Sequence, residues 1–359
     1  MIPSINWSTG LPSTGNNANN CNMFFDDADF DPQSDLVDLR GKVAVVTGDD
    51  ANTHHTTLHL ARAGAKVYLG TPHSSEPLKL LENLRWELGY GYGEIVWFEL
   101  DLSCPARTRD AARWLLDMEG RKGRLDILVN GCCHLEGKGK GKEEINELGL
   151  SRTVTVNYIS PFVFTKTLLP LLAKTANEGL NEDVRIVNVI PASHKIIPKV
   201  NLKFKTVDDL NVRGLPSGFL RFCHSKFLCL LWTRHLQHLI NAEGIHNMIA
   251  LAVDPGAPSS SPSSHAHDND KHHIHILRKM LSIHIHMPTT TPIEPHEQGY
   301  ATAFAAAGEA VWGEWERYKG GYVEGVKRPK VLSIGGSEGE HVEERLWELT
   351  EKVLRVCRV

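Results

Sequence analysis

The sequence lacks long apolar runs, and none approaches the roughly 20 residues that a transmembrane helix needs. Its charge lacks a dominant sign, because 39 basic and 43 acidic residues leave a net charge of −4. The polar start, residues 1–22, lacks the apolar stretch of a signal peptide. The seven cysteines lack the spacing of a disulfide framework or a zinc ribbon. These absences predict no membrane span and no nucleic-acid partner, and they favour a reduced, cytoplasmic location.

What the sequence does contain is a strand–helix–strand pattern between residues 42 and 70. The run 43–47 is short, β-branched and closed by a Thr-Gly pair, which is typical of a buried parallel strand. A helical stretch then ends at Gly64, and a second apolar run covers 65–70. This order is the opening unit of a dinucleotide-binding fold.

The alternation continues along a chain of 359 residues, which is long enough for one large core. We predict further helices at 75–88, 103–117, 144–174 and 218–243, and strands at 94–100, 125–130, 184–190 and 247–253. Such alternation predicts an α/β fold with a doubly wound parallel sheet, the Rossmann fold. Ligands of these sheets bind at the carboxyl ends of the strands, where the strand order reverses.

The first 38 residues do not follow this pattern. They combine an asparagine-rich stretch, 16–20, with an acidic run from Asp26 to Asp38, and such a composition buries no core. We therefore predict a flexible acidic arm over 1–38, either a solvated tail or an acidic docking segment, followed by one domain over 39–359.

One set of residues has the order and spacing of a known protein family: Thr47, Gly48, Asp101, Asn130, Asn157, Lys226, Pro255 and Gly256. Jointly they resemble the short-chain dehydrogenase/reductase family, although Pro-Gly alone carries little weight. The segments 183–189, 224–226 and 346–350 are similar to those of fungal proteins related to retinol dehydrogenases. The resemblance implies NAD or NADP as cofactor, and carbonyl reduction or alcohol oxidation on a small apolar substrate. It also allows a homo-oligomer built through the two longest helices.

The catalytic residues that the resemblance implies are incomplete. In the family, a Tyr four residues before a Lys transfers the proton, and four residues place both side chains on one helix face. Lys226 matches the Lys, but Phe222 stands at the Tyr position and has no proton to donate. Pro191 stands at the position of the family's Ser, while Asn157 matches its Asn. Asn157 and Lys226 are therefore the catalytic positions that remain.

Three nearby residues could replace the missing proton donor. We expect His194 to be structural, because the family carries a His there beside an intact Ser and Tyr. Ser193 reaches the site only if its loop changes register, and His224 is two residues from Phe222 and should face elsewhere.

The cofactor site is altered as well. The family's turn, Thr-Gly-x-x-x-Gly-x-Gly, brings backbone and a helix N-terminus close to the pyrophosphate, but Asn52 and His54 replace its last two glycines. Asp49 and Asp50 add negative charge where the phosphates would bind, and His54 could partly compensate by donating a hydrogen bond to a phosphate. Pro72 stands where NADP-preferring relatives often carry Arg. We therefore expect weakened affinity, with the adenosine half best preserved. The implied contacts are Gly48, Asn52, His54, Asp101 near the adenine, Leu102, Asn130 beside the ribose, Lys226, Pro255 and Gly256.

Residues 257–296 correspond to the variable, substrate-covering segment of the family, and here they are rich in histidine. The His-x-His pairs in this segment are a spacing that zinc ligands can have, but no Cys or carboxylate cluster at ligand spacing joins them apart from Asp268 and Asp270. We expect a mobile cap and no metal site.

Three functional hypotheses follow. The first is an NAD(P)-dependent oxidoreductase with an altered proton relay. The second is a non-redox enzyme that uses the same pocket, since a fold does not fix a function. The third is a pseudoenzyme that binds a small molecule or a partner protein, because the glycine turn, the Ser and the Tyr have changed together.

Overall fold

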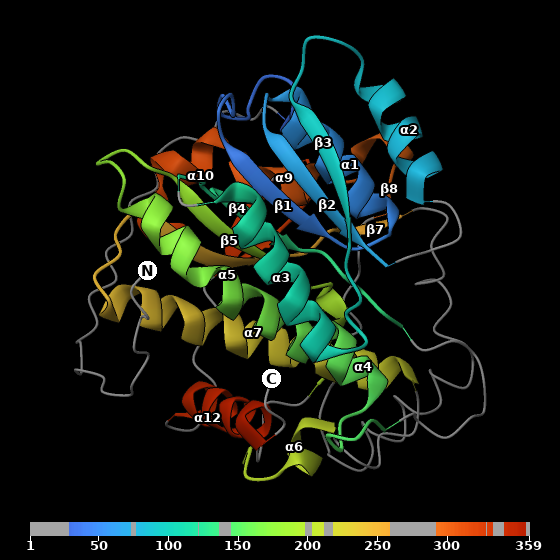
Figure 1. Cartoon of the computed structure of the whole chain (residues 1–359), viewed down its shortest axis with the longest axis vertical. Coiled ribbons are helices and arrows are strands. Elements are labelled where there is room, and N and C mark those ends of the chain that lie inside the picture. The colour runs from blue at the N-terminus through green and yellow to red at the C-terminus, as the bar shows by residue number, and fades with distance from the viewer. Residues whose placement is uncertain are drawn as a thin grey trace.

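An eight-stranded sheet forms the centre of the molecule (Figure 1). This computed structural model describes residues 29–72, 77–120, 122–135, 145–197, 203–211, 218–258, 292–327, 329–332 and 341–356. The strand order is β10-β9-β6-β5-β4-β1-β2-β3, and every pairing is parallel except that of β10 with β9. The strands are β1 Val43–Thr47, β2 Lys66–Thr71, β3 Glu94–Glu99, β4 Ile127–Asn130, β5 Val184–Val189, β6 Met248–Val253, β9 Tyr322–Glu324 and β10 Lys330–Leu332.

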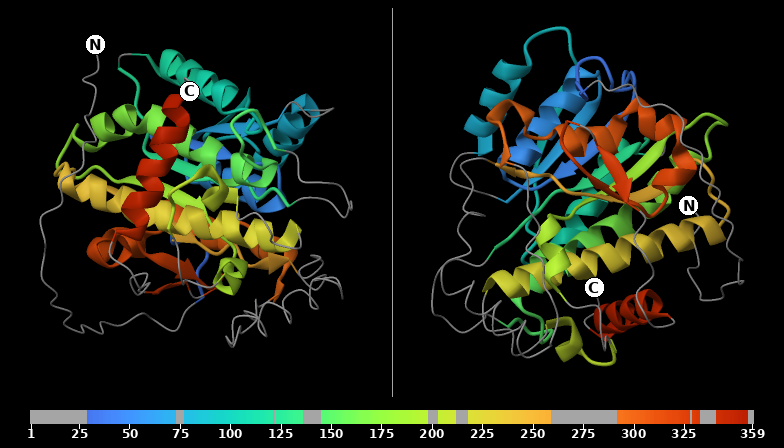
Figure 2. Two further views of the ribbon diagram at one scale, coloured as in Figure 1. Left: turned by 90° about the horizontal axis from the view of Figure 1, so that it is seen from below. Right: turned by 180° about the vertical axis from the view of Figure 1, so that it is seen from behind.

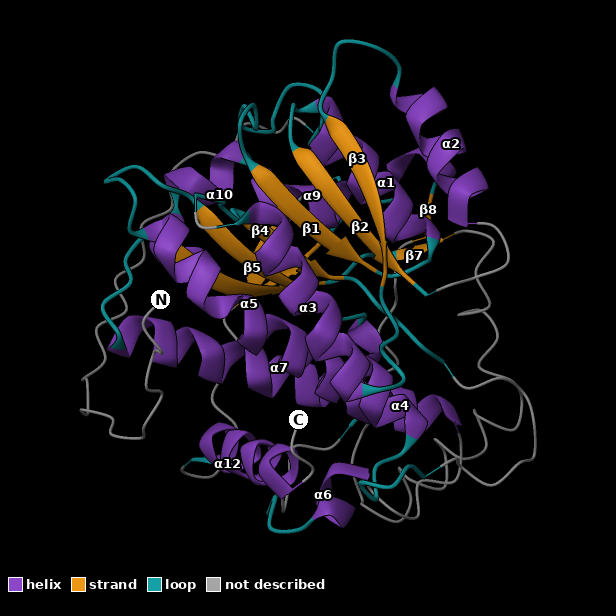
Figure 3. Cartoon of the chain, viewed as in Figure 1, coloured by secondary structure: helices purple, strands orange, loops and turns teal. Residues whose placement is uncertain are grey.

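Helices cover both faces of the sheet (Figure 3). On one face lie α3 (Pro105–Glu119), α5 (Ser160–Ala176) and α7 (Gly218–Ala242). On the other lie α1 (Ala51–Arg62), α2 (Pro77–Leu88) and α9 (Tyr300–Ala307). The remaining helical elements are α4 Arg152–Val154, η1 Thr155–Ile159, η2 Ala192–Ile196, α6 Val207–Asn211, η4 Pro295–Glu297, α10 Glu309–Gly313, α11 Trp315–Tyr318 and α12 Val342–Val356. The predicted doubly wound α/β sheet is confirmed.

The strand order reverses between β1 and β4. β1 pairs with β2 on one side and with β4 on the other, so the connections leave the two strands in opposite directions. All five residues of β1 and all four of β4 are buried, which explains their continuous apolar sequence. The crevice outside these strand ends is where ligands of doubly wound sheets bind.

The helix predicted over 144–174 begins later than expected. Ile145 and Ser151 form an isolated antiparallel bridge, and Gly149 adopts a positive φ of 73° between them. The Ser151 side chain then caps α4 by accepting from the Val154 amide. The polar turn before Arg152 therefore stops the helical periodicity from extending to Glu144.

The predicted boundary between arm and domain is also displaced. Residues 29–38, which the sequence assigns to a flexible arm, pack on α9 and its surroundings. Phe30 is buried with its ring 5.2 Å from that of Phe304, and the Val37 amide donates to the Ala307 carbonyl at 2.9 Å. Apolar residues within the acidic run account for this docking. The rest of the predicted arm, 1–28, lies outside the described residues.

Only the two ends of the predicted cap are described. β7 (Ala257–Pro258) and β8 (Pro292–Ile293) form a two-stranded parallel sheet, while 259–291 lie outside the described residues. Within the described ranges, no helix is both long enough and apolar enough to cross a membrane.

The C-terminal helix α12 lies across α7 on the outer side of the helix layer (Figure 2). Trp347 packs on Phe162 of α5 with ring centroids 4.6 Å apart. The Tyr158 hydroxyl and the Thr350 hydroxyl are hydrogen-bonded at 2.8 Å, and Arg234 pairs with Glu343 at 3.0 Å. This helix therefore packs on the domain through its apolar face.

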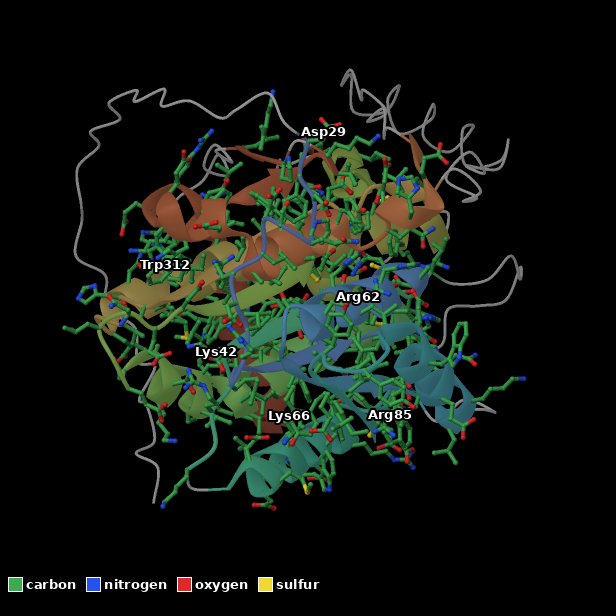
Figure 4. The ribbon with its side chains drawn as sticks, turned by 90° about the horizontal axis from the view of Figure 1, so that it is seen from above. Asp29, Lys42, Arg62, Lys66, Arg85 and Trp312 are labelled. Carbon is green, nitrogen blue, oxygen red and sulfur yellow. The ribbon has the colours of Figure 1, made fainter. Side chains whose placement is uncertain are left out.

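Charged residues gather at the amino ends of the strands, opposite the crevice. Lys42 and Lys66 mark these ends of β1 and β2 (Figure 4). The Lys42 ammonium lies 2.8 Å from Glu182 and 3.3 Å from the buried Asp126, which also binds Arg124. The strands are therefore fixed by ion pairs at one end, which leaves the carboxyl ends as the candidate site.

Candidate functional site

The turn after β1 keeps its first glycine for steric reasons. Gly48 has a φ of 128°, and a Cβ atom there would lie 2.6 Å from the Thr53 hydroxyl. The turn then leads into α1, where Asp50 is the N-cap and its carboxylate accepts from the Thr53 amide at 2.8 Å. A negative charge thus already occupies the helix terminus that would attract a pyrophosphate.

The two residues at the lost glycine positions face different neighbours. The Asn52 amide oxygen accepts from the Thr302 hydroxyl at 3.0 Å, which ties α1 to α9. His54 is partly buried, and burial lowers the pKa of its imidazole although Asp50 and Asp49 oppose this. The ring is therefore neutral at pH 7, so it brings no positive charge to a phosphate.

Asp101 follows β3 at the carboxyl edge of the sheet, where the sequence predicts an adenine contact. Its carboxylate accepts from the Ser103 amide at 2.9 Å and from Arg107 at 3.2 Å. Burial works to raise the pKa of Asp101, but these hydrogen bonds outweigh it, so the pKa lies below its ordinary value. The Leu102 side chain is buried in the core, so any cofactor contact there would come from its backbone.

Asn130 takes part in a network of polar side chains. Its amide group donates to the Thr165 hydroxyl at 3.0 Å and to the Asn188 side chain at 2.8 Å. Asn188 in turn donates to Thr233 of α7 at 2.8 Å. This chain of polar side chains joins β4 and β5 to the helices above them. The Asn130 side chain is therefore buried and helps to hold these elements together.

Lys226 and Phe222 share one face of α7, as their spacing predicts. The Lys226 ammonium lies 6.0 Å from the centre of the Phe222 ring. It donates to the carbonyl oxygens of Cys132 at 2.6 Å and of Val189 at 3.2 Å. Burial would lower the pKa of Lys226, but the sulfur atoms of Cys133 and its neighbours outweigh burial and raise it. The charged amine thus binds the protein's own backbone at the position where the family binds a ribose.

Asn157 lies in η1, a single π-helical turn that runs into α5. Its side chain holds the loop after β4 through the backbone of His134, accepting at 2.8 Å and donating at 2.8 Å. Its amide also donates to Ser225 at 2.9 Å. Its backbone carbonyl accepts from the Cys229 thiol at 3.0 Å. The backbone carbonyl of Asn157 is therefore already bonded to a thiol of α7.

The three possible replacement residues behave differently. The His194 Nδ1–H donates to the Pro191 carbonyl at 2.9 Å, and the ring packs edge-on against Tyr322, so its role is structural. The His224 ring contacts the Leu210 carbonyl at 3.1 Å, away from Phe222. The Ser193 hydroxyl is buried and has no hydrogen-bond partner among the described residues.

The end of β6 carries a group that sequence reasoning missed. Asp254 precedes Pro255, is only 9% exposed and accepts from the Gly256 amide at 3.2 Å. Burial raises the pKa of Asp254 to about 6. An acidic residue directly after a buried strand was the signal that could have identified it. Gly256, with a φ of 75°, packs so closely on Ile293 of β8 that a Cβ atom would lie 2.9 Å from its side chain.

The described residues contain no group of three His, Cys, Asp or Glu side chains that could hold a metal ion. Most of the histidines considered as zinc ligands lie in 259–291, outside the described part.

Comparisons with known proteins agree with this geometry. A family model described as short chain dehydrogenase matches residues 42–193. A short-chain dehydrogenase/reductase of Armillaria gallica is 32% identical over 295 residues, covering 81% of this chain and 86% of that protein. A crystal structure of an uncharacterised protein from Mycobacterium paratuberculosis aligns with a TM-score of 0.61 at 20% identity, covering 90% of this chain and 97% of that one. A blue fluorescent protein from a metagenomic library, in complex with NADPH, aligns with a TM-score of 0.53 at 19% identity, covering 79% and 96%.

Proposed function

Because the chain belongs to the short-chain dehydrogenase/reductase family, we propose that it binds a small apolar molecule at the carboxyl ends of its parallel strands but lacks the family's tyrosine-dependent hydride transfer. Phe222 is the observation that carries this proposal. It stands one helical turn before Lys226, 6.0 Å from its ammonium, and a phenyl ring has no proton to exchange. The protein is then a ligand-binding pseudoenzyme of the family.

The rate contributions of the two missing groups support a loss of hydride transfer over a mere weakening of it. A positioned proton donor typically contributes about 10²- to 10⁴-fold to a rate, and an oxyanion donor about 10²- to 10³-fold. Phe222 removes the first, and Pro191 has neither a hydroxyl nor an amide hydrogen to supply the second. Although such losses are rarely additive, the larger of them alone makes ordinary turnover unattainable.

The nicotinamide cofactor of the family fits this chain only in part. When bound, it would supply the hydride, and Asp101 and Lys226 would hold the adenine and ribose ends. The pyrophosphate between them meets the Asp50 carboxylate at the start of α1. Neither NAD nor NADP is favoured, because Pro72 replaces the basic residue of NADP-preferring relatives. We therefore propose weak cofactor binding. The NADPH complex of the structural neighbour is a property of that protein and does not change this proposal.

Titration of the purified protein with NADPH and NADH tests the proposal, because a ligand of the native state raises its apparent stability. We expect no thermal shift and no fluorescence enhancement up to about 1 mM cofactor. We also expect no oxidation of NADPH in the presence of aliphatic ketones and aldehydes.

A double variant, Phe222→Tyr with Pro191→Ser, serves as the matched comparison. Micromolar cofactor binding combined with turnover by the natural protein would reject the proposal. Turnover by the double variant alone would support it, since the chemical groups gained are the two hydroxyls and the amide hydrogen of residue 191.

A further inference from the structure

A cavity of about 440 Å³ lies at the edge of the sheet formed by β10, beside the amino end of β9. Its volume is within the range of small-molecule sites in proteins. Its wall is formed by α7, by α11 with the turn that follows it, and by β10. These elements contribute Arg234, Gln237, His238, Asn241, Glu316, Arg317, Lys319, Gly320, Gly321, Val331 and Leu332.

This cavity is separate from the crevice at the carboxyl ends of the strands. Arg234 and Asn241 follow Lys226 along the single helix α7. At the rise of about 1.5 Å per residue of an α-helix, Arg234 is about 12 Å and Asn241 about 22 Å further along the helix than Lys226. A ligand in the cavity would therefore not touch the positions of the family's reaction.

The α7 side of the cavity is held in place by a buried amide. Arg234, His238 and Asn241 share one face of α7, because residues three and four apart are neighbours on a helix. Gln237 is buried beside them. Its side-chain oxygen accepts from the Ala250 amide at 2.7 Å, and its nitrogen donates to the Asn241 side-chain oxygen at 2.8 Å. Because that oxygen is already used, the group that Asn241 can offer to a ligand is its amide nitrogen, a donor.

The opposite wall is a turn that packs between α7 and β10. Gly320 has a φ of 65°, and a Cβ atom there would lie 3.5 Å from the Gln237 side chain. A Cβ atom on Gly321 would lie 2.5 Å from the Val331 side chain. The two glycines therefore allow the turn to come close to both elements, and the turn brings Lys319 into the wall of the cavity.

Cations outnumber carboxylates in this wall. Its permanently charged side chains are Arg234, Arg317, Lys319 and Glu316. Each cation pairs with a carboxylate, and the distances are 3.0 Å for Arg234–Glu343, 2.6 Å for Arg317–Glu314 and 2.5 Å for Lys319–Glu316. Two of these carboxylates, Glu343 and Glu314, are not part of the wall. They orient the arginine side chains and offset only part of the positive charge at the cavity.

Arg234 and Lys319 retain hydrogen-bond donors for a ligand. A guanidinium has five N–H donors and an ammonium has three, so one carboxylate does not use them all. Their side chains are 17% and 16% exposed, and water competes less for such donors than for those on an open surface. A carboxylate only accepts, and it can bind a guanidinium through two parallel hydrogen bonds. Val331 and Leu332 add apolar side chains to the same wall, which favours an organic acid over inorganic phosphate.

We propose that this cavity binds a small carboxylic acid with a short apolar body. The carboxylate accepts hydrogen bonds from Arg234 and Lys319, and the Asn241 amide nitrogen is a third donor. The apolar body lies against Val331 and Leu332. The site goes beyond the proposed function, because its residues are not those of the crevice and it needs no cofactor.

Calorimetric titration of the full-length protein with hexanoate at low salt tests the proposal. We expect a dissociation constant of about 1 mM or below, as is reasonable for a ligand of this size. Two competitors separate the parts of the ligand. Both 1-hexanol, which has the apolar body without the charge, and inorganic phosphate, which has the charge without the body, should displace hexanoate only at about 10-fold higher concentration or more. Equal displacement by either competitor would overturn the proposal.

Substitutions locate the bound hexanoate. Arg234→Gln should weaken its binding by about 10-fold or more, and Lys319→Gln by about 3-fold or more. Glu343→Gln removes the partner of Arg234 without changing the wall, so it should tighten binding by about 3-fold. A loss of folding would not produce tighter binding. Arg113→Gln is the matched control, because it changes a 60% exposed arginine of α3, and it should leave the affinity unchanged.

An absence of hexanoate binding up to about 20 mM would overturn the proposal. So would an unchanged affinity in Arg234→Gln or a weaker one in Glu343→Gln. Circular dichroism confirms that each variant is folded, and Lys319→Gln is a second variant that leaves the contact of Arg234 with α12 intact. The cofactor titration of the previous subsection concerns the crevice, so the two proposals fail separately.

Discussion

Two aspartates, Asp126 and Asp254, are buried at opposite ends of the strands. Their surroundings give their negative charges different effects on the stability of the fold. Asp126 is 1% exposed and pairs with Arg124 at 2.6 Å, so its charge is compensated. Asp254 is 9% exposed and accepts a hydrogen bond from the Gly256 amide. A buried carboxyl group without a cation favours its neutral form. The first aspartate therefore serves stability, and the second costs stability when it ionises.

Replacing Asp254 by Asn is expected to stabilise the protein at neutral pH but not in acid. The pKa of Asp254 is about 6 in the folded state against an ordinary 3.8. The folded state therefore holds the proton more tightly, and the stability that this provides is complete below about pH 4 and lost as the pH rises through 6. The difference corresponds to about 3 kcal/mol.

Urea unfolding of the natural protein and of Asp254→Asn at pH 4.5, 6 and 7.5 measures this effect. The free energy of unfolding of the variant, relative to the natural protein, should rise across the series. A difference that does not change with pH would show that Asp254 titrates normally.

At the scale of elements, the sequence predicts a contact correctly where both residues lie on the same helix. The four-residue spacing within α7 is enough to place Phe222 beside Lys226. The orientation of Asn130 was not predictable in this way, because its partners Thr165 and Asn188 lie on other elements, 35 and 58 residues away. The burial of Asp254 was not predicted for a similar reason, because it depends on two other elements, η2 and β9.

The N-terminus of α1 offers a prediction at the same scale. Asp50→Asn keeps a side-chain oxygen that can cap the helix but removes the negative charge from the pyrophosphate position. We expect NADPH and NADH to bind about 10-fold more tightly to this variant at low salt, because one repulsive charge near a phosphate is removed.

Calorimetric titration at low and high ionic strength provides the measurement. The gain should shrink as salt screens the charge. Asp101→Asn is the matched control, since it removes a charge of the same sign at the adenine end, where we expect no gain. Equal affinities for the natural protein and Asp50→Asn would mean that Asp50 does not oppose the cofactor.

At the scale of the whole molecule, α12 changes what the family resemblance implied about assembly. The resemblance implied a homo-oligomer through the two longest helices, which are α5 and α7. In this chain, α12 covers part of that surface with Trp347, Leu346 and Leu349, all buried. A homo-oligomer through the same faces would require α12 to leave, so we expect the α5–α7 face not to be an interface.

The packing of α12 can be tested by a pair of tryptophan substitutions. Trp347→Ala should lower the free energy of unfolding by about 3–5 kcal/mol, because it leaves a cavity beside Phe162. Trp312→Ala removes the same side chain from α10, where it is 39% exposed, and should cost far less. Chemical unfolding measures both, and equal losses would mean that α12 contributes no more than a surface residue. Analytical ultracentrifugation of Trp347→Ala shows whether loosening α12 permits self-association.

Buried histidines make the whole fold sensitive to acid. His59 on α1 and His224 and His235 on α7 all have their pKa lowered to about 4, in each case chiefly by burial. Their folded pKa is depressed below the ordinary 6.5, so the stability they contribute is complete above that value and lost as the pH falls toward 4. Each corresponds to about 3 kcal/mol. The titration of Asp254 has the opposite effect on the free energy of unfolding over nearly the same pH range, but it is one group and the histidines are three.

We therefore expect the free energy of unfolding to fall steeply between pH 7 and pH 4.5, as measured by urea titration at closely spaced pH values. His224→Gln should remove about half of this net slope, because three histidines less the opposing Asp254 leave two groups, and a Gln amide can meet the Leu210 carbonyl without binding a proton. His246→Gln, which changes an exposed ring, should leave the slope unchanged. If both variants have the slope of the natural protein, His224 protonates equally in the folded and unfolded states, and the acid sensitivity must come from the carboxylates at the amino ends of the strands.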